Sequence, residues 1–122
     1  MNGIVIYLDK TGCARHYAAW LAQTTGFDLI NLALQSHCDL SAYEYFILGS
    51  GLENNRLQMA PWLQRHWLEL FDREILLYFS SKQEITRRKK QELLCANLPR
   101  QISDVIKVFA LPPHNVADAS LT

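Results

Sequence analysis

Continuous apolar runs alternate with amphipathic stretches along this chain, and the alternation predicts strands and helices in turn. Residues 3–8 form an unbroken apolar run rich in β-branched side chains, which is typical of a strand buried on both faces. From residue 13 to residue 25 the apolar positions recur at spacings of three and four, which predicts a helix. Gly26 suits the end of that helix, because glycine readily adopts the left-handed conformation found there.

The same alternation continues through the rest of the chain. The predicted strands are residues 27–32, 45–48, 75–79 and 105–111, and the predicted helices are residues 59–71 and about 84–96. Gly49-Ser50-Gly51 predicts a flexible turn directly after the third strand. Because strands alternate with helices, the sequence predicts one α/β domain over residues 1–122, with a parallel sheet and right-handed crossovers.

The composition is that of a globular protein, with 49% apolar and 20% charged residues. Twelve basic residues balance twelve acidic ones, so the overall charge favours neither nucleic-acid binding nor an acidic tail. No apolar run is long enough to span a bilayer and the start lacks a signal-peptide pattern, so we expect a cytoplasmic protein. The three cysteines have no CxxC spacing, and we expect no metal site.

Three segments are predicted to meet at the carboxyl edge of the sheet, where ligands bind in open parallel sheets. They are residues 9–15, 49–56 and 80–84. The first is the turn Lys10-Thr11-Gly12-Cys13-Ala14-Arg15, which leads into a helix N-terminus and therefore favours an anion such as a phosphate. The alternative is an ordinary turn in which Asp9 or Thr11 caps the helix.

These segments also resemble a known family. The chain has Lys10-Thr11-Gly12, then the helix sequence Tyr17-Ala18-Ala19-Trp20-Leu21-Ala22. Further along it has Asp39-Leu40-Ser41-Ala42-Tyr43-Glu44, Gly49-Ser50-Gly51-Leu52 with Arg56, and Trp62-Leu63 with Trp67. In order and spacing these motifs resemble the flavodoxin domains of menaquinone-dependent protoporphyrinogen oxidase-type proteins.

The resemblance implies a doubly wound, five-stranded flavodoxin-like sheet of order 2-1-3-4-5. It implies FMN as the cofactor, electron transfer or a flavin-linked oxidation as the function, and a redox protein or a quinone as the electron partner. The implied cofactor-binding residues are Lys10, Thr11, Gly12, Cys13, Ala14 and Arg15 at the phosphate, and Gly49, Ser50, Gly51, Leu52, Glu53, Asn54, Ser80 and Ser81 around the ring. No acid–base side chain stands out, and we assign no catalytic residue.

The chain departs from the family pattern in ways that favour an alternative function. Cys13 and Ala14 stand where the family offers hydroxyl groups to the phosphate, and Glu53 replaces an aromatic residue that would stack on the ring. Residues 116–121 are too short to replace the final helix, so one sheet face should be covered mainly by the first helix. We expect a homodimer or a larger complex to cover that face. The alternative function is a flavodoxin-like domain without flavin that acts as a protein-binding or regulatory module.

Other functions receive less support. A phosphatase-like loop needs C-x5-R, but the sixth residue after Cys13 is Ala19. Cys13 is either a low-pKa thiolate at a helix N-terminus or a simple buried or half-exposed thiol. The run of residues 87–90 (Arg87, Arg88, Lys89 and Lys90) is either a solvated helix face or a contact for an acidic partner or an anionic membrane surface. We expect Trp20, Trp62 and Trp67 to pack in the core.

Overall fold

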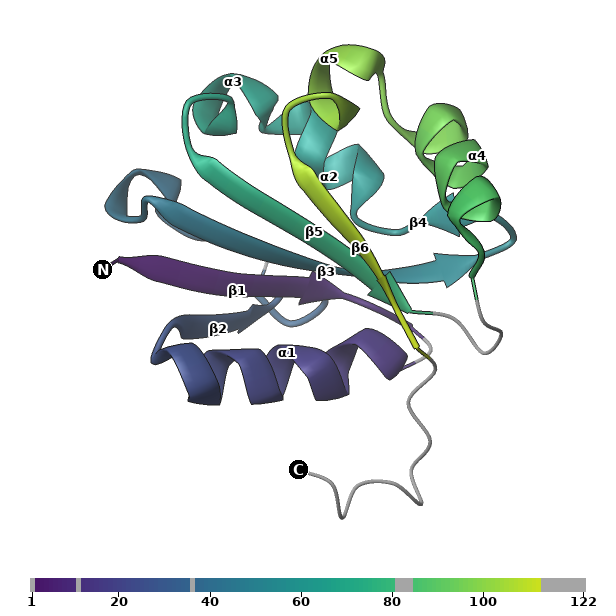
Figure 1. Ribbon diagram of the computed structural model, residues 1–122. Helices are drawn as coiled ribbons and strands as arrows, with labels where there is room; N and C mark the ends of the chain where they lie inside the picture. The colour runs from purple at the N-terminus through teal and green to yellow at the C-terminus, as the bar shows by residue number, and fades with distance from the viewer. Residues whose placement is uncertain (1, 11, 36, 81–84, 113–122) are drawn as a thin grey trace.

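A computed structural model describes residues 2–10, 12–35, 37–80 and 85–112. Five strands form a parallel sheet in the order β2-β1-β3-β5-β6, and β4 pairs antiparallel with the end of β3. Their bounds are β1 Gly3–Leu8, β2 Asp28–Asn31, β3 Tyr45–Glu53, β4 Arg56–Leu57, β5 Glu74–Ser80 and β6 Lys107–Leu111. This arrangement confirms the predicted fold class and the predicted order of the five parallel strands (Figure 1).

The helices are divided unequally between the two faces of the sheet. Figure 1 shows α1 (Cys13–Thr25) on one side, and α2 (Ala60–Arg65), α3 (Trp67–Leu70), α4 (Arg87–Asn97) and α5 (Arg100–Ser103) on the other. A short 3-10 turn, η1 (Leu40–Ala42), leads into β3. None of the helices in the described part of the chain is long and apolar enough to cross a membrane.

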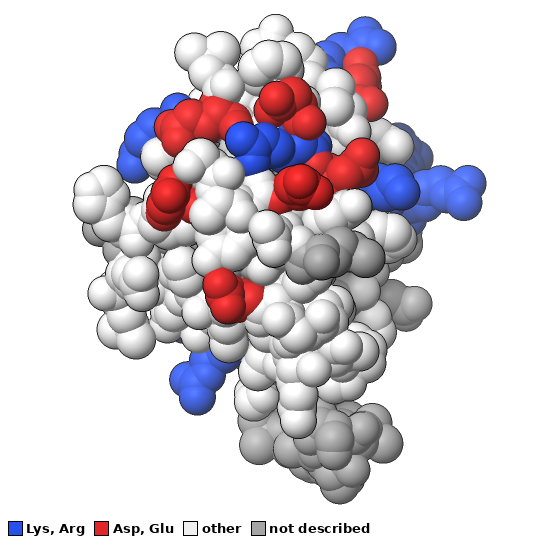
Figure 2. Space-filling view, turned by 90° about the vertical axis from the view of Figure 1, so that its left-hand side faces the viewer, with Lys and Arg blue, Asp and Glu red and all other residues white. Residues whose placement is uncertain are grey.

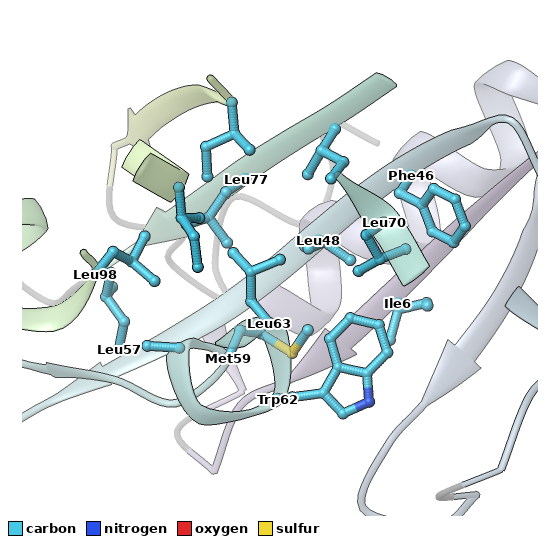
Figure 3. Close-up of a cluster of buried hydrophobic side chains, with 14 of the residues drawn as sticks. Ile6, Phe46, Leu48, Leu57, Met59, Trp62, Leu63, Leu70, Leu77 and Leu98 are labelled. Atoms are coloured by element: carbon cyan, nitrogen blue, oxygen red, sulfur yellow. The ribbon is translucent and has the colours of Figure 1, made fainter. Parts of the chain in front are cut away.

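The larger core lies between the sheet and α2 to α5. Figure 3 shows Ile6, Phe46, Leu48 and Leu77 of the sheet packed against Trp62 and Leu63 of α2 and Leu70 of α3. A smaller cluster under α1 contains the following buried residues: Val5, Tyr7, Ala14, Ala18 and Tyr78. The sheet is thus buried deeply on one face and only in part on the other.

The uncovered part of the sheet lies beside α1, under β5 and β6. Alternate residues of a strand point to opposite faces, and Ile47, Leu76 and Phe109 point to the α1 side. Since α1 packs mainly against β1 and β3, Phe109 keeps 47% of its surface exposed. Glu74 and Lys107 flank the same surface. We call these five residues the open face.

The predicted flexible turn at Gly49-Ser50-Gly51 is wrong, because these residues are buried inside β3. Leu8 of β1 and Phe79 of β5 both pair with Ser50, so the strand continues through the glycines. Glycine is needed there for close packing: a Cβ on Gly49 would lie 2.4 Å from the hydroxyl of Tyr78. The glycines therefore mark a crowded strand.

The helical layer also differs from the prediction. Residues 59–71, expected to form one helix, form two helices separated at His66. The His66 carbonyl accepts a hydrogen bond from the Glu69 N–H, which closes a tight turn at this point. Trp20 is wrongly predicted as a core residue: it is 50% exposed, because Ala14 and Ala18 make the buried contacts of α1. The expectation for residues 116–121 lies outside the described residues.

Candidate functional site

The turn after β1 and the end of β3 meet at the carboxyl edge of the sheet. Leu8, the last residue of β1, is in register with Ser50, and Gly51 is in register with Ser80. Beyond that level β3 runs on to Glu53 and returns as β4. Two of the three predicted segments are therefore brought together. Of the third, only Ser80 is described, and Ser81 lies outside the described residues.

The turn between β1 and α1 leads through a left-handed glycine into a helix N-terminus, where backbone N–H groups can bind an anion. Gly12 precedes the helix with φ 90°, a conformation that favours glycine, and a Cβ there would meet nothing within 4 Å. Lys10 and Arg15 are exposed, whereas Ala14 is fully buried and has no hydroxyl to offer. Thr11 lies outside the described residues, as does the side chain of Cys13.

The carboxylate of Asp9 lies at the start of α1. The Ala14 N–H donates to Asp9 Oδ2 at 2.5 Å, and a hydrogen bond to a charged carboxylate is stronger than a neutral one. The same carboxylate is packed against β3, since a Cβ on Gly51 would lie 2.4 Å from Asp9 Oδ1. An acidic side chain thus holds an amide that a bound phosphate would use, which is the capping alternative from the sequence.

Tyr78 fastens the first turn of α1 to the sheet. Its hydroxyl donates to the Ala14 carbonyl at 2.8 Å. Burial first, and then the negative charge of Asp9, raises the pKa of Tyr78 well above its ordinary value. The hydroxyl therefore stays protonated and works as a donor. Because the tyrosine belongs to an apolar strand, the sequence marked it only as a core residue.

Gln58 connects the β1–α1 turn to the β3–β4 hairpin. The Lys10 N–H donates to Gln58 Oε1 at 2.9 Å, and Gln58 Nε2 donates to Glu53 Oε2 at 3.3 Å. An open hollow of about 580 Å³ lies here, lined among others by Lys10, Glu53, Arg56, Gln58 and Pro61. No local sequence pattern indicates this role of Gln58, because its partner Lys10 lies 48 residues away along the chain.

The β3–β4 hairpin turns at Asn54 and Asn55. Both have positive φ, 53° and 62°, which a two-residue type I′ turn requires and asparagine tolerates. Asn97, the last residue of α4, holds this hairpin: Oδ1 accepts from the Leu57 N–H at 2.9 Å, and Nδ2 donates to the Asn55 carbonyl at 2.9 Å. The Asn-Asn pair is the sequence signal that could have predicted the turn.

The two described serines of the predicted ring site are engaged with the protein itself. Ser50 is fully buried, and its hydroxyl accepts from the Met59 N–H at 3.1 Å and donates to the Gly51 carbonyl at 2.8 Å. The Ser80 hydroxyl donates to the Pro112 carbonyl at 3.1 Å. Leu52, Glu53 and Asn54 are at least partly exposed on the hairpin.

The described residues do not fit the phosphate of FMN at the start of α1. A phosphate would have to displace Asp9 from Ala14 and then remain beside its charge. Two unit charges about 5 Å apart repel by roughly 3 kcal/mol at an effective dielectric constant of about 20, and a phosphate monoester carries up to about two charges. The opposing charges of Lys10 and Arg15 are exposed to solvent and screened.

The basic run at the start of α4 is partly neutralised. Arg88 lies 3.6 Å from the carboxylate of Glu92 one turn later, and both side chains are largely exposed. Arg87 is exposed, and Lys89 and Lys90 are half-buried. The contact with an anionic surface stays a prediction.

A separate hollow of about 170 Å³ lies under the chain between β2 and β3. Its lining includes Cys38, His66 and Glu69, and the His66 ring is 3.1 Å from the Glu69 carboxylate. Burial, and then the charge of Asp39, raises the pKa of the Cys38 thiol, which keeps it in the unreactive protonated form. In the described part of the chain no three metal-ligating side chains come together.

Comparison with known proteins identifies the fold. No family model matches the chain, and no curated protein matches its sequence. Among solved structures, a candidate flavoprotein from Bacteroides eggerthii aligns with a TM-score of 0.66 and 12% identity, over 90% of this chain and 87% of that one. A WrbA-like flavodoxin from Agrobacterium tumefaciens aligns with a TM-score of 0.59 and 14% identity, over 96% and 87% of the two chains.

An archaeal flavodoxin aligns with a TM-score of 0.58 and 14% identity, over 99% of this chain and 90% of that one. At these identities the similarity shows the fold, and the chain has a flavodoxin-like fold. The narrower resemblance to protoporphyrinogen oxidase-type proteins stays a prediction.

Proposed function

We propose that this chain is a flavodoxin-like domain that works as a protein-binding module through its open face. The observation that carries the proposal is the exposure of Phe109 on an apolar surface of a parallel sheet. Sheets of this kind normally have both faces covered, and large exposed apolar surfaces mark interaction sites. The strand edge adds to this, since β6 ends the sheet and its outer edge pairs with no described strand.

The charges around the open face suit a second copy of the chain. Glu74 and Lys107 flank a hollow of about 290 Å³, and within the described part of the chain neither forms an ion pair. Lys107 of β6 is in register with Leu76 of β5, and Glu74 lies two residues before Leu76 on the same face. The charges of Glu74 and Lys107 are therefore diagonal neighbours on adjacent strands. A two-fold axis across the face would bring each Lys107 over the other copy's Glu74, as in a self-complementary interface.

The surroundings of the open face are consistent with docking on its apolar part. Figure 2 shows the end of the molecule at which the parallel strands begin. Most of the coloured charged groups gather in its upper half, on the side of α3, and the described atoms of the lower half, toward α1, are mostly white. A partner on the open face would bury apolar area there and meet the charges of Glu74 and Lys107 beside it.

An apolar dye such as 1-anilinonaphthalene-8-sulfonate tests the proposal. We expect its fluorescence to rise with dilute wild-type protein and to fall by at least half with Phe109→Ser, because the dye binds the open face. Leu68→Ser is the matched control, since Leu68 is 86% exposed on the opposite side of the molecule. No enhancement by the wild type, or equal enhancement by Phe109→Ser, would contradict the proposal.

FMN binding with electron transfer is the second candidate function. The similar solved structures favour it, because they are flavodoxins and a candidate flavoprotein. The backbone at Gly12 and the glycine-containing end of β3 would then frame the cofactor, and the flavin would supply the redox chemistry. For this function, the hydrogen bond between the Asp9 carboxylate and the Ala14 N–H has to break. Binding of FMN by the wild-type protein would distinguish this function from the protein-binding module.

A further inference from the structure

We propose that Asp9 is the specificity-determining residue of the carboxyl edge, a built-in anion that closes the start of α1 to phosphate ligands. The inference concerns a different surface from the open face and goes beyond the binding function proposed there. In this domain a left-handed glycine precedes α1, as in a turn that could bind a phosphate. The carboxylate of Asp9 nevertheless accepts a hydrogen bond from a backbone N–H at the start of α1.

The contacts of Asp9 show that the carboxylate is held from two sides. One oxygen accepts the Ala14 N–H at 2.5 Å, and the other lies against Gly51, where an added Cβ would come within 2.4 Å. The side chain is half-buried. A helix N-terminus is stabilised by a negative charge, and in this chain the charge comes from the preceding turn itself.

The neighbouring hairpin reinforces the arrangement. Gln58 accepts the Lys10 N–H and donates to Glu53, so a second amide of the turn is used and a second carboxylate is held close by. A phosphate entering here would meet two acidic side chains and would find the Ala14 and Lys10 amides already engaged. Asp9 is the decisive group, because its carboxylate accepts an N–H of the first turn of α1 directly, whereas Glu53 is linked to the turn through Gln58.

Replacement of Asp9 by serine should reverse the selectivity. Asp9 precedes Gly12, the N-cap residue of α1, so the substitution leaves the N-cap itself unchanged and the fold should be kept. A serine hydroxyl also donates hydrogen bonds to phosphate oxygens, and the substitution removes the repulsive charge. Removing one unit charge about 5 Å away corresponds to roughly a 100-fold gain in affinity.

The test is a fluorescence titration of FMN with wild-type protein, Asp9→Ser and the matched control Asp104→Ser, which makes the same substitution at an exposed carboxylate at the end of α5. We expect no saturable quenching with the wild type or with Asp104→Ser up to the highest concentration used. Asp9→Ser should give saturable quenching, with an affinity at least roughly 100-fold above the wild-type limit set by that concentration. Near-UV circular dichroism verifies that each variant is folded. Micromolar binding by the wild type would overturn the proposal, and so would a folded Asp9→Ser that binds no better than the wild type.

An amide spectrum adds a readout that a merely structural role for Asp9 would not change. In Asp9→Ser, added FMN should shift the Ala14 amide resonance, whereas in the wild type the same resonance should stay in place. A wild-type shift would overturn the proposal even if quenching were weak.

Discussion

At each end of the sheet, a hydrogen bond to one carboxylate side chain holds two neighbouring chain segments together. At the carboxyl edge Asp9 caps α1, and at the opposite end the Tyr43 hydroxyl donates to Asp28 Oδ2 at 2.6 Å. The second bond links the segment before β3 to the start of β2. Both bonds involve a carboxylate, and such bonds are stronger than neutral ones.

The Tyr43–Asp28 bond makes stability depend on pH in the alkaline range. The hydrogen bond to Asp28, followed by burial and the negative charge of Asp28, raises the pKa of Tyr43 to about 12. The unfolded value is about 10, so the bond contributes fully below about pH 10 and its contribution is lost as the pH rises toward 12. Tyr43→Phe should therefore cost about 1 kcal/mol at pH 8 and less at pH 11.

Urea denaturation of the wild type and Tyr43→Phe at the two pH values measures this difference. Asp28→Asn is the control, because it removes the charged acceptor and should bring the titration of Tyr43 closer to its ordinary range. A gap between wild type and Tyr43→Phe that stays constant or grows with pH would exclude this role for the bond.

The sequence predicts local residue roles better than long-range ones. Gly26 adopts the left-handed conformation expected of it, with φ 78°, and Asp9 was one of two named capping candidates. The roles of Gln58 and Asn97 depend on partners about 40 or more residues away, which no local pattern reveals. Trp20 was misjudged because an apolar helix face can be wider than the surface it packs on.

At the level of elements, the five parallel strands follow from their apolar runs, and the short elements do not. β4 has two residues and α5 has four, too few for a periodic pattern to show. The extent of β3 was underestimated, because glycine is uncommon in strands and was interpreted as a turn signal. As a result, the hairpin that forms one wall of the candidate site was predicted only as a loop.

The β3–β4 hairpin depends on one side chain of α4. Asn97 bonds the Leu57 N–H, the Asn55 carbonyl and the Leu93 carbonyl, and the bonds to Leu57 and Leu93 are partly buried. Asn97→Ala removes all three. We expect a loss of about 2 kcal/mol in the free energy of unfolding, measured by urea denaturation. Asn97→Asp should lose less, because it keeps the acceptor for Leu57. A change below about 0.5 kcal/mol in Asn97→Ala would contradict this role.

For the whole molecule, the unequal covering of the sheet matters most. Four helices and the larger core lie on one face, and α1 alone packs on the other among the described residues. The chain has a flavodoxin-like fold, yet a carboxylate holds the start of its first helix and an apolar surface is exposed beside that helix. The first feature disfavours a phosphate cofactor, and the second favours a protein partner.

Binding of a second copy at the open face is tested by the molecular mass of the protein in solution, determined by sedimentation equilibrium over a range of concentrations. We expect a reversible dimer for the wild type and for the control Leu68→Glu, and a monomer for Phe109→Glu, because a buried carboxylate on the open face would be unpaired. A wild-type protein that stays monomeric at millimolar concentration, or a Phe109→Glu variant that dimerises as well as the wild type, would contradict it.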